Sequence, residues 1–132
     1  MTAIEEHERS HSQVLNYLGV ANHIEGALCI PEPNTCQLSI LEYAAYLVAG
    51  AVGQQLAHPE QDNRLRDGCG GDMALLCDLC HIDRKYEAYV STVLISILTG
   101  DPQRFARLIP NPEHFTLLVD AVAFATKVLK EK

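Results

Sequence analysis

The segment that most constrains the fold is residues 36–57, CQLSILEYAAYLVAGAVGQQLA, because its apolar side chains recur at helical spacing on almost every face. A helix with so little polar surface is normally central in its domain or covered by a second subunit. Its longest nearly uninterrupted apolar run, residues 43–53, is too short for a bilayer, which takes about 20 residues to cross. We therefore expect a central helix of a globular protein and no membrane span.

The rest of the chain is divided by helix breakers and capping residues. Pro31 and Pro33 end the first apolar pattern, Asp72 is placed to cap the third, and Asn111 precedes Pro112 as a capping residue at the start of the last. A kink is expected near residues 82–85, where the apolar stripe is interrupted. The expected helices span about 3–28, 36–57, 72–99, 101–109 and 112–130.

This pattern predicts an all-α fold, an antiparallel bundle of four long helices plus one short helix. With 132 residues and no alternating strand pattern, the chain is expected to form a single helical domain over 1–132. Residues 58–71, which combine proline, charge and three glycines, predict a long solvated loop.

Charge and cysteine content limit the functional classes. The chain carries 17 acidic and 10 basic residues, a net charge of −7, without a cluster of lysine and arginine. Affinity for nucleic acid or an anionic membrane comes mainly from such clusters, so neither partner is expected. The first residues lack the basic start and apolar run of a secretory signal, which predicts a cytoplasmic protein with reduced thiols.

Small residues recur along the central helix at every fourth position, at Ala45, Ala49 and Gly53. Such a stripe lets another helix approach closely. Tyr43 and Tyr46 on the same segment are typical of a packed interface. Together with the apolar circumference of the helix, these five positions predict a homodimer interface.

Cys77, Cys80 and His81 form Cys-x-x-Cys-His, the attachment pattern of c-type haem, and Cys69 would complete a four-ligand zinc set. Haem attachment requires export, and structural zinc sites usually pair ligands from separate elements. Free cysteines are often buried as small apolar side chains. We therefore predict that Cys77 and Cys80 face the core and that no cofactor is bound.

A second metal hypothesis comes from histidines and carboxylates at helical spacing. His7 and His11 lie four residues apart, and Glu8 with His11 forms Glu-x-x-His, half of the signature of di-iron bundles. The full alternative set is His7, Glu8, His11, Glu42, Asp78, His81 and Asp120. The preferred prediction is no metal, because residues 5–13 are polar on every face, as a solvated helix end would be.

The functional prediction is a non-enzymatic helical protein that acts through protein contacts, as a binder, inhibitor or adaptor, and forms a homodimer. An acidic surface favours a partner with a basic surface, contacted through loop 58–71 or through Glu5, Glu6 and Glu8. The alternative is a metal-binding bundle, such as a di-metal oxidoreductase with carboxylate and histidine ligands.

Overall fold

The computed structural model describes residues 3–19, 22–25, 28–31, 38–57 and 69–131. The predicted helical class is confirmed. Five α-helices account for most of these residues: α1 (Ala3–Tyr17), α2 (Ile40–Ala57), α3 (Cys69–Leu79), α4 (Glu87–Leu98) and α5 (Pro112–Lys130). Within the described residues, every helix is too short or too polar to cross a membrane.

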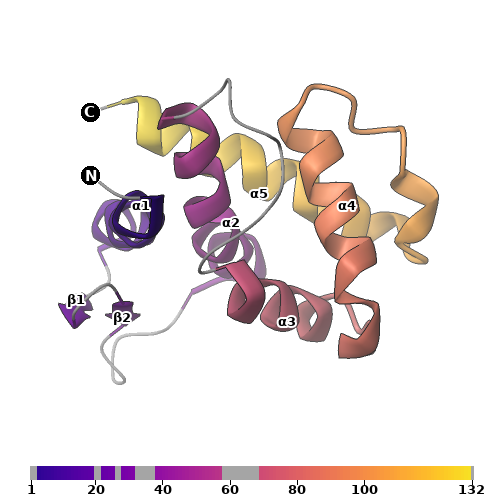
Figure 1. Cartoon of the computed structure of the whole chain (residues 1–132), viewed down its shortest axis with the longest axis horizontal. Coiled ribbons are helices and arrows are strands. Elements are labelled where there is room, and N and C mark those ends of the chain that lie inside the picture. The colour runs from indigo at the N-terminus through magenta and orange to yellow at the C-terminus, as the bar shows by residue number, and fades with distance from the viewer. Residues whose placement is uncertain (1–2, 20–21, 26–27, 32–37, 58–68, 132) are drawn as a thin grey trace.

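Helix α2 is central, as its apolar circumference predicted. Figure 1 shows α1 on one side of it and α3 with α4 on the other, and α2 packs against α1, α3 and α5. Nine consecutive or nearly consecutive residues of α2 are buried. The main core gathers side chains from all five helices around it, including Val14, Val48, Val52, Leu76, Leu94, Leu118 and Ala125.

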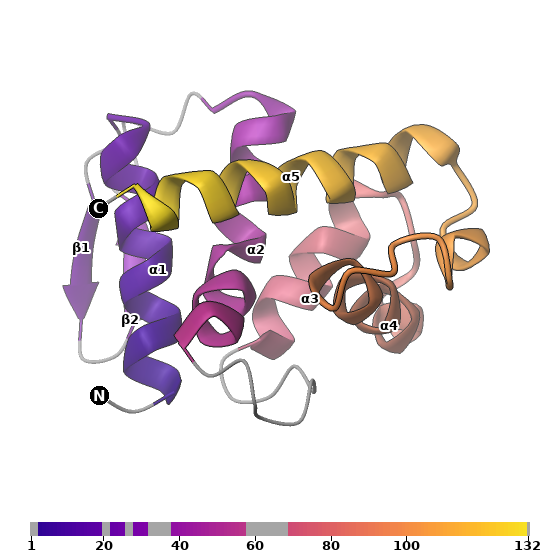
Figure 2. The same ribbon diagram turned by 90° about the horizontal axis from the view of Figure 1, so that it is seen from above.

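The antiparallel bundle arrangement is not confirmed. In an antiparallel bundle the long helices lie side by side, inclined by only about 20°. Figure 2 shows α5 running crosswise to α1, and Figure 1 shows α1 almost end-on where α5 runs across the view. The helices that meet on α2 therefore cross one another.

The first predicted helix is too long. It ends at Tyr17, and the chain turns at Gly19, whose φ of 75° is a conformation that glycine adopts without steric cost. Two short strands then form an antiparallel hairpin, β1 (Asn22–Glu25) and β2 (Leu28–Pro31), with His23 opposite Ile30. The prediction that residues 18–28 continue the helix is wrong, because it overlooked the glycine as a C-terminal stop.

Helix α2 begins later than predicted, at a reciprocal capping box. The Ser39 amide donates to Glu42 Oε1 at 2.9 Å, and the Glu42 amide donates to Ser39 Oγ at 3.1 Å. Two helix-terminal donors are satisfied in this way. Residues 36 and 37, where the predicted helix began, lie outside the described residues.

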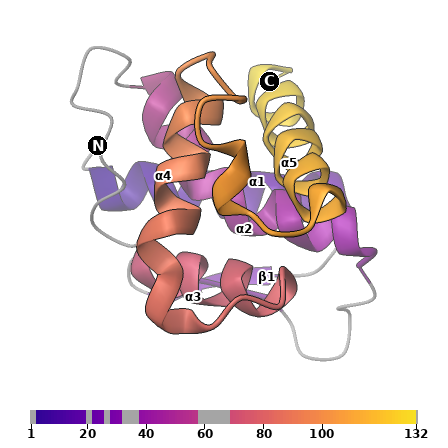
Figure 3. The same ribbon diagram turned by 90° about the vertical axis from the view of Figure 1, so that its right-hand side faces the viewer.

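The third predicted helix is broken where the kink was expected. Helix α3 ends at Leu79, a 3-10 turn covers Arg84–Tyr86, and α4 begins at Glu87. At the break, the backbone of His81 adopts the left-handed conformation, with φ 54°. The amide of the next residue, Ile82, donates a hydrogen bond to the Cys77 carbonyl at 2.8 Å. This is the 6→1 bond of a Schellman C-cap. Figure 3 shows α4 rising steeply from the end of α3.

The C-terminal part follows one of its two predicted starts. Asn111 accepts from the Glu113 amide at 2.9 Å with Pro112 in the first turn of α5, as predicted. The short helix predicted over 101–109 is reduced to turns and one 3-10 turn at Ala106–Leu108.

Candidate metal centre

The two histidines of α1 are the least expected feature of the interior. His7 and His11 are 0% and 2% exposed, although their neighbours in sequence are almost all polar. Their four-residue spacing puts both rings on the same face of α1, and that face lies against α2. The prediction that this helix end is solvated is therefore wrong.

Two glycines of α2 make room for this polar face. A Cβ added at Gly50 would overlap the His7 ring and lie 2.5 Å from its Cδ2 atom. A Cβ added at Gly53 would overlap Ser10 Oγ and lie 2.6 Å from Ser10 Cβ. The close crossing expected from the small residues thus occurs between α2 and α1 of the same chain. Burial of Ala45 and Ala49, both 0% exposed, fits the same intramolecular packing.

The third member of the cluster is Asp72, in the first turn of α3. Its Oδ2 atom lies 2.8 Å from His7 Nε2 and 3.1 Å from His11 Nε2, and the two Nε2 atoms are 2.9 Å apart. These residues are the one group of three metal-ligand side chains that meet within the described part of the chain. Side chains of α1 and α3 that lie 61 and 65 residues apart in sequence therefore converge on one point.

The outer nitrogens of both rings fix their orientation. His11 Nδ1 lies 2.6 Å from the backbone carbonyl of Tyr46, which can only accept, so Nδ1 carries the proton and Nε2 of the neutral ring offers a lone pair. His7 Nδ1 lies 3.4 Å from Gln54 Oε1, in position to donate to it. Metal-binding histidines almost always donate their second N–H to such an acceptor.

The inner side of the cluster consequently brings the lone pair of His11 Nε2, the carboxylate oxygen of Asp72 and His7 Nε2 to contact distance. His7 Nε2 donates a hydrogen bond to one of the other two atoms when it carries the ring proton, and all three atoms can act as metal ligands when Nδ1 carries it. Zinc–nitrogen and zinc–oxygen bonds of about 2.0–2.2 Å in a tetrahedral site place ligand atoms about 3.3–3.6 Å apart. The observed separations of 2.8, 2.9 and 3.1 Å require only small outward shifts to match.

The charge state of Asp72 also suits a ligand. Burial, the largest single effect, acts to raise the pKa of this carboxyl group, but its hydrogen bonds to His11 and His7 and the charge interactions with both rings together hold the pKa below the ordinary 3.8. The carboxylate therefore stays ionised at neutral pH, which is the form that binds metal.

The other members of the predicted di-metal set do not join this cluster. Glu42 is used in the capping box of α2. Asp78 is exposed and accepts from Arg84 Nε at 3.0 Å, which lowers its pKa. His81 and Asp120 are exposed, on the turn after α3 and on α5. Glu8 is buried beside the histidines but is not part of the three-residue group.

The cysteine set is likewise not assembled among the described side chains. Cys77 and Cys80 are buried free thiols, as predicted, whereas His81 turns out to solvent. Burial raises the pKa of Cys77, and burial with the neighbouring Cys77 raises that of Cys80 to about 11. In the metal-free protein both sulfurs therefore stay protonated at neutral pH and pack as small apolar side chains. The side chain of Cys69 lies outside the described residues.

Sequence reasoning found His7 and His11, and it found Gly53 as part of a close helix crossing, but it missed Gly50, Gln54 and the role of Asp72 in this cluster. Asp72 was predicted as a helix cap, yet α3 begins three residues earlier and its carboxylate reaches α1 instead. The His-x-x-x-His pair was the one local signal, since a chelating pair on one helix needs a third ligand from elsewhere.

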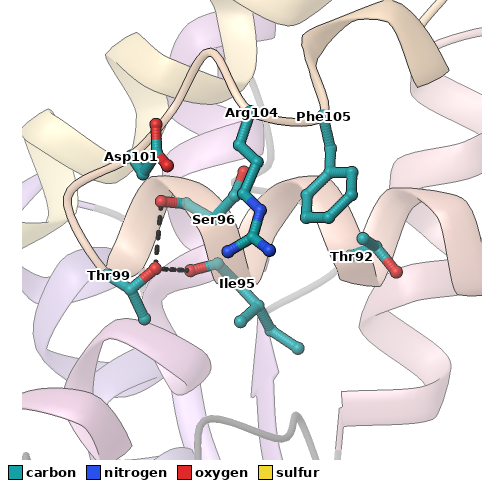
Figure 4. A pocket seen from close by; sticks show the side chains of 7 residues that line it. All are labelled: Thr92, Ile95, Ser96, Thr99, Asp101, Arg104 and Phe105. Carbon is teal, nitrogen blue, oxygen red and sulfur yellow. Dashed lines mark hydrogen bonds between the residues drawn. The ribbon is translucent and has the colours of Figure 1, made fainter.

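A hollow of about 150 Å³ lies at the C-terminal end of α4, away from the histidines. Figure 4 shows Arg104 and Phe105 on one side of it and Thr99 and Ser96 on the other. The hydroxyl groups of Thr99 and Ser96 donate to backbone carbonyls of α4, and the Arg104 guanidinium stacks 5.2 Å from the Phe105 ring. The polar groups of this hollow are thus largely used by the fold itself.

Comparison with known proteins gives no further guidance: no family model, no curated protein and no solved structure matches the chain.

Proposed function

We propose that the chain binds one divalent transition-metal ion through His7 Nε2, His11 Nε2 and the carboxylate of Asp72. The observation that carries the proposal is the convergence of these three atoms at 2.8–3.1 Å from two helices distant in sequence. The Tyr46 carbonyl supports it, because it fixes the tautomer of His11 so that Nε2 faces the centre.

The donor set indicates which ions fit. Two imidazole nitrogens and one carboxylate oxygen suit zinc, copper, nickel or iron, whereas calcium and magnesium take mainly oxygen ligands. With three ligands from the described residues, a tetrahedral ion takes a fourth ligand from solvent or from elsewhere in the chain. This proposal differs from both predictions made from the sequence. The preferred prediction was that no metal is bound, and the alternative was a site for two ions, whereas we propose a site for one.

The test is metal binding to the full chain after dialysis against EDTA. Titration with Co²⁺, followed by its visible absorption, and calorimetry with Zn²⁺ should both give one equivalent. His11→Gln and Asp72→Asn should each weaken Zn²⁺ binding at least 100-fold, since each removes one of three ligands.

The matched control is His81→Asn, which removes an exposed imidazole and leaves a residue that tolerates the left-handed backbone. It should bind Zn²⁺ as the wild type does. Equal affinity in wild type, His11→Gln and Asp72→Asn would contradict the proposal, because binding would then come from other groups.

Protein contact is the second candidate function, and an exposed aromatic pair favours it. Tyr86 and Tyr89 stack with ring centroids 5.5 Å apart while 41% and 49% exposed, and Lys85 lies 5.1 Å from the Tyr86 ring. Tyrosines are enriched at protein interfaces. We propose that this pair, instead of the small-residue stripe, provides the contact of the homodimer predicted from the sequence.

The homodimer is tested by sedimentation equilibrium of wild type and of the Tyr86→Ser, Tyr89→Ser double variant. A dimer that dissociates in the variant supports the contact, and a wild-type monomer at high micromolar concentration contradicts it. Contact with a basic partner through the acidic first turns has less support, because Glu8 is buried and Glu6 is half-buried.

A further inference from the structure

Helices α1 and α3 are attached to different parts of the molecule. Helix α1 packs on α2, α5 and the hairpin, whereas α3 packs on α2 and α4. In the described part of the chain, α1 and α3 share little other contact. The bonds from Asp72 Oδ2 to His7 and His11 therefore form the main link between them.

Different kinds of contact attach the start and the remainder of α3 to the rest of the molecule. Met73, Leu76, Cys77 and Cys80 are buried in the main core and anchor its middle and its end. Asp72 precedes all of them, and its side chain is directed at the two histidines. Among the described side chains of α3, Asp72 is therefore the one held by the polar cluster, and the apolar contacts begin with its neighbour Met73.

That polar cluster has a specific requirement. Its inner atoms are a carboxylate oxygen and two imidazole nitrogens, one of which has its tautomer fixed by the Tyr46 carbonyl. A divalent ion among them would replace the hydrogen bonds inside the cluster by three bonds to one centre. Ions that bind only the assembled site stabilise it in proportion to their occupancy.

We infer that the metal ion is a clip that fastens the first turn of α3 to α1, so that metal occupancy controls the order of α3 at this end. The inference rests on the proposed metal site and adds a role for it: the ion acts on conformation. Without the ion, the contacts of Asp72 with the two histidines and the burial of Met73 hold this end of α3, and the ion adds three bonds that suppress its local opening.

Hydrogen–deuterium exchange of the full chain, metal-free and with Zn²⁺ at 100 times its dissociation constant, tests the clip. Amides in the first turns of α3 that open when the ion leaves should exchange about 100-fold more slowly with Zn²⁺. Amides of α5 between residues 118 and 129 provide the internal reference and should change by less than threefold.

Asp72→Asn should lose the Zn²⁺-dependent protection of α3, and the control His81→Asn should keep it. Far-UV circular dichroism of both variants establishes that they are folded. The outcomes separate the two proposals. Zn²⁺ binding by calorimetry with unchanged exchange in α3, or with equal protection of α3 and α5, overturns the clip and leaves the metal site standing. Absence of Zn²⁺ binding overturns both.

Discussion

Replacing Gly50 with alanine tests the packing on which the metal centre depends. The added methyl group would overlap the His7 ring, which is fully buried and has no free space to enter. Either the ring rotates out of the cluster or α1 moves away from α2. Overpacking of this kind costs about 1–3 kcal/mol, and alanine regains about 1 kcal/mol over glycine in a helix interior.

The free energy of unfolding should therefore fall by about 0–2 kcal/mol in Gly50→Ala, the difference between those two effects. Urea unfolding of the metal-free protein, followed by circular dichroism, measures it. Zn²⁺ affinity should fall at least tenfold, because His7 can no longer point Nε2 at Asp72.

A double-mutant cycle isolates the contact. In a His7→Ala background the clash is gone, so Gly50→Ala should stabilise by about 1 kcal/mol, and the coupling energy should be about 1–3 kcal/mol. Gly53→Ala serves as the control, since its added methyl group meets Ser10 and should show almost no coupling to His7. A Gly50→Ala protein that is more stable than wild type and binds Zn²⁺ normally would refute the placement of His7 over α2.

Three further predictions concern other parts of the fold. Asn111→Ala should lower the free energy of unfolding by about 1 kcal/mol through loss of the α5 cap, while Asn111→Asp should be nearly neutral in the same urea assay. His81→Gly should raise it by about 1 kcal/mol, because glycine adopts the left-handed conformation without the cost that His81 bears at φ 54°; no gain would mean that the His81 ring makes a compensating contact. The Cys80 thiol, with its pKa raised by burial from 9.0 to about 11, keeps its proton in the folded state longer than in the unfolded state. Its contribution of about 3 kcal/mol is thus complete below pH 9 and disappears between pH 9 and 11, and urea unfolding of Cys80→Ala should lack that part of the pH dependence.

The parts of the fold that could be predicted from sequence are those determined by neighbouring residues. Asn111 followed by Pro112 specifies the start of α5 locally, and the structure has it there. The apolar circumference of residues 40–57 placed α2 at the centre, because no exposed position suits such a helix. The end of α1 could also have been predicted, since Gly19 follows its last turn and glycine is a common C-terminal stop of helices. The apolar residues after Gly19 continue the helical spacing, and the predicted helix was therefore too long.

The cluster of His7, His11 and Asp72, the candidate metal centre, could not be predicted because the residues that form it and the glycines that make room for it lie on three helices. Judged along α1 alone, His7 and His11 belong to a polar segment and look solvated. They are buried because Gly50 and Gly53 on α2 leave space for this face of α1. They have a carboxylate partner because the side chain of Asp72 reaches them from α3. Helical periodicity relates residues of one helix to each other and carries no information on which helix will cover them.

The energetics of this region also favour a functional explanation over a structural one. Glycine in a helix interior costs about 1 kcal/mol relative to alanine, and the central helix has two of them where α1 crosses. Buried ionisable groups are generally no more stabilising than apolar side chains of similar volume. A chain selected for stability alone would do at least as well with leucine at positions 7 and 11 and asparagine or serine at 72. Ion binding would account for the presence of two helix glycines, two oriented imidazoles and one carboxylate at this place. The empty site lowers the stability of the fold, and the free energy of ion binding would offset that loss.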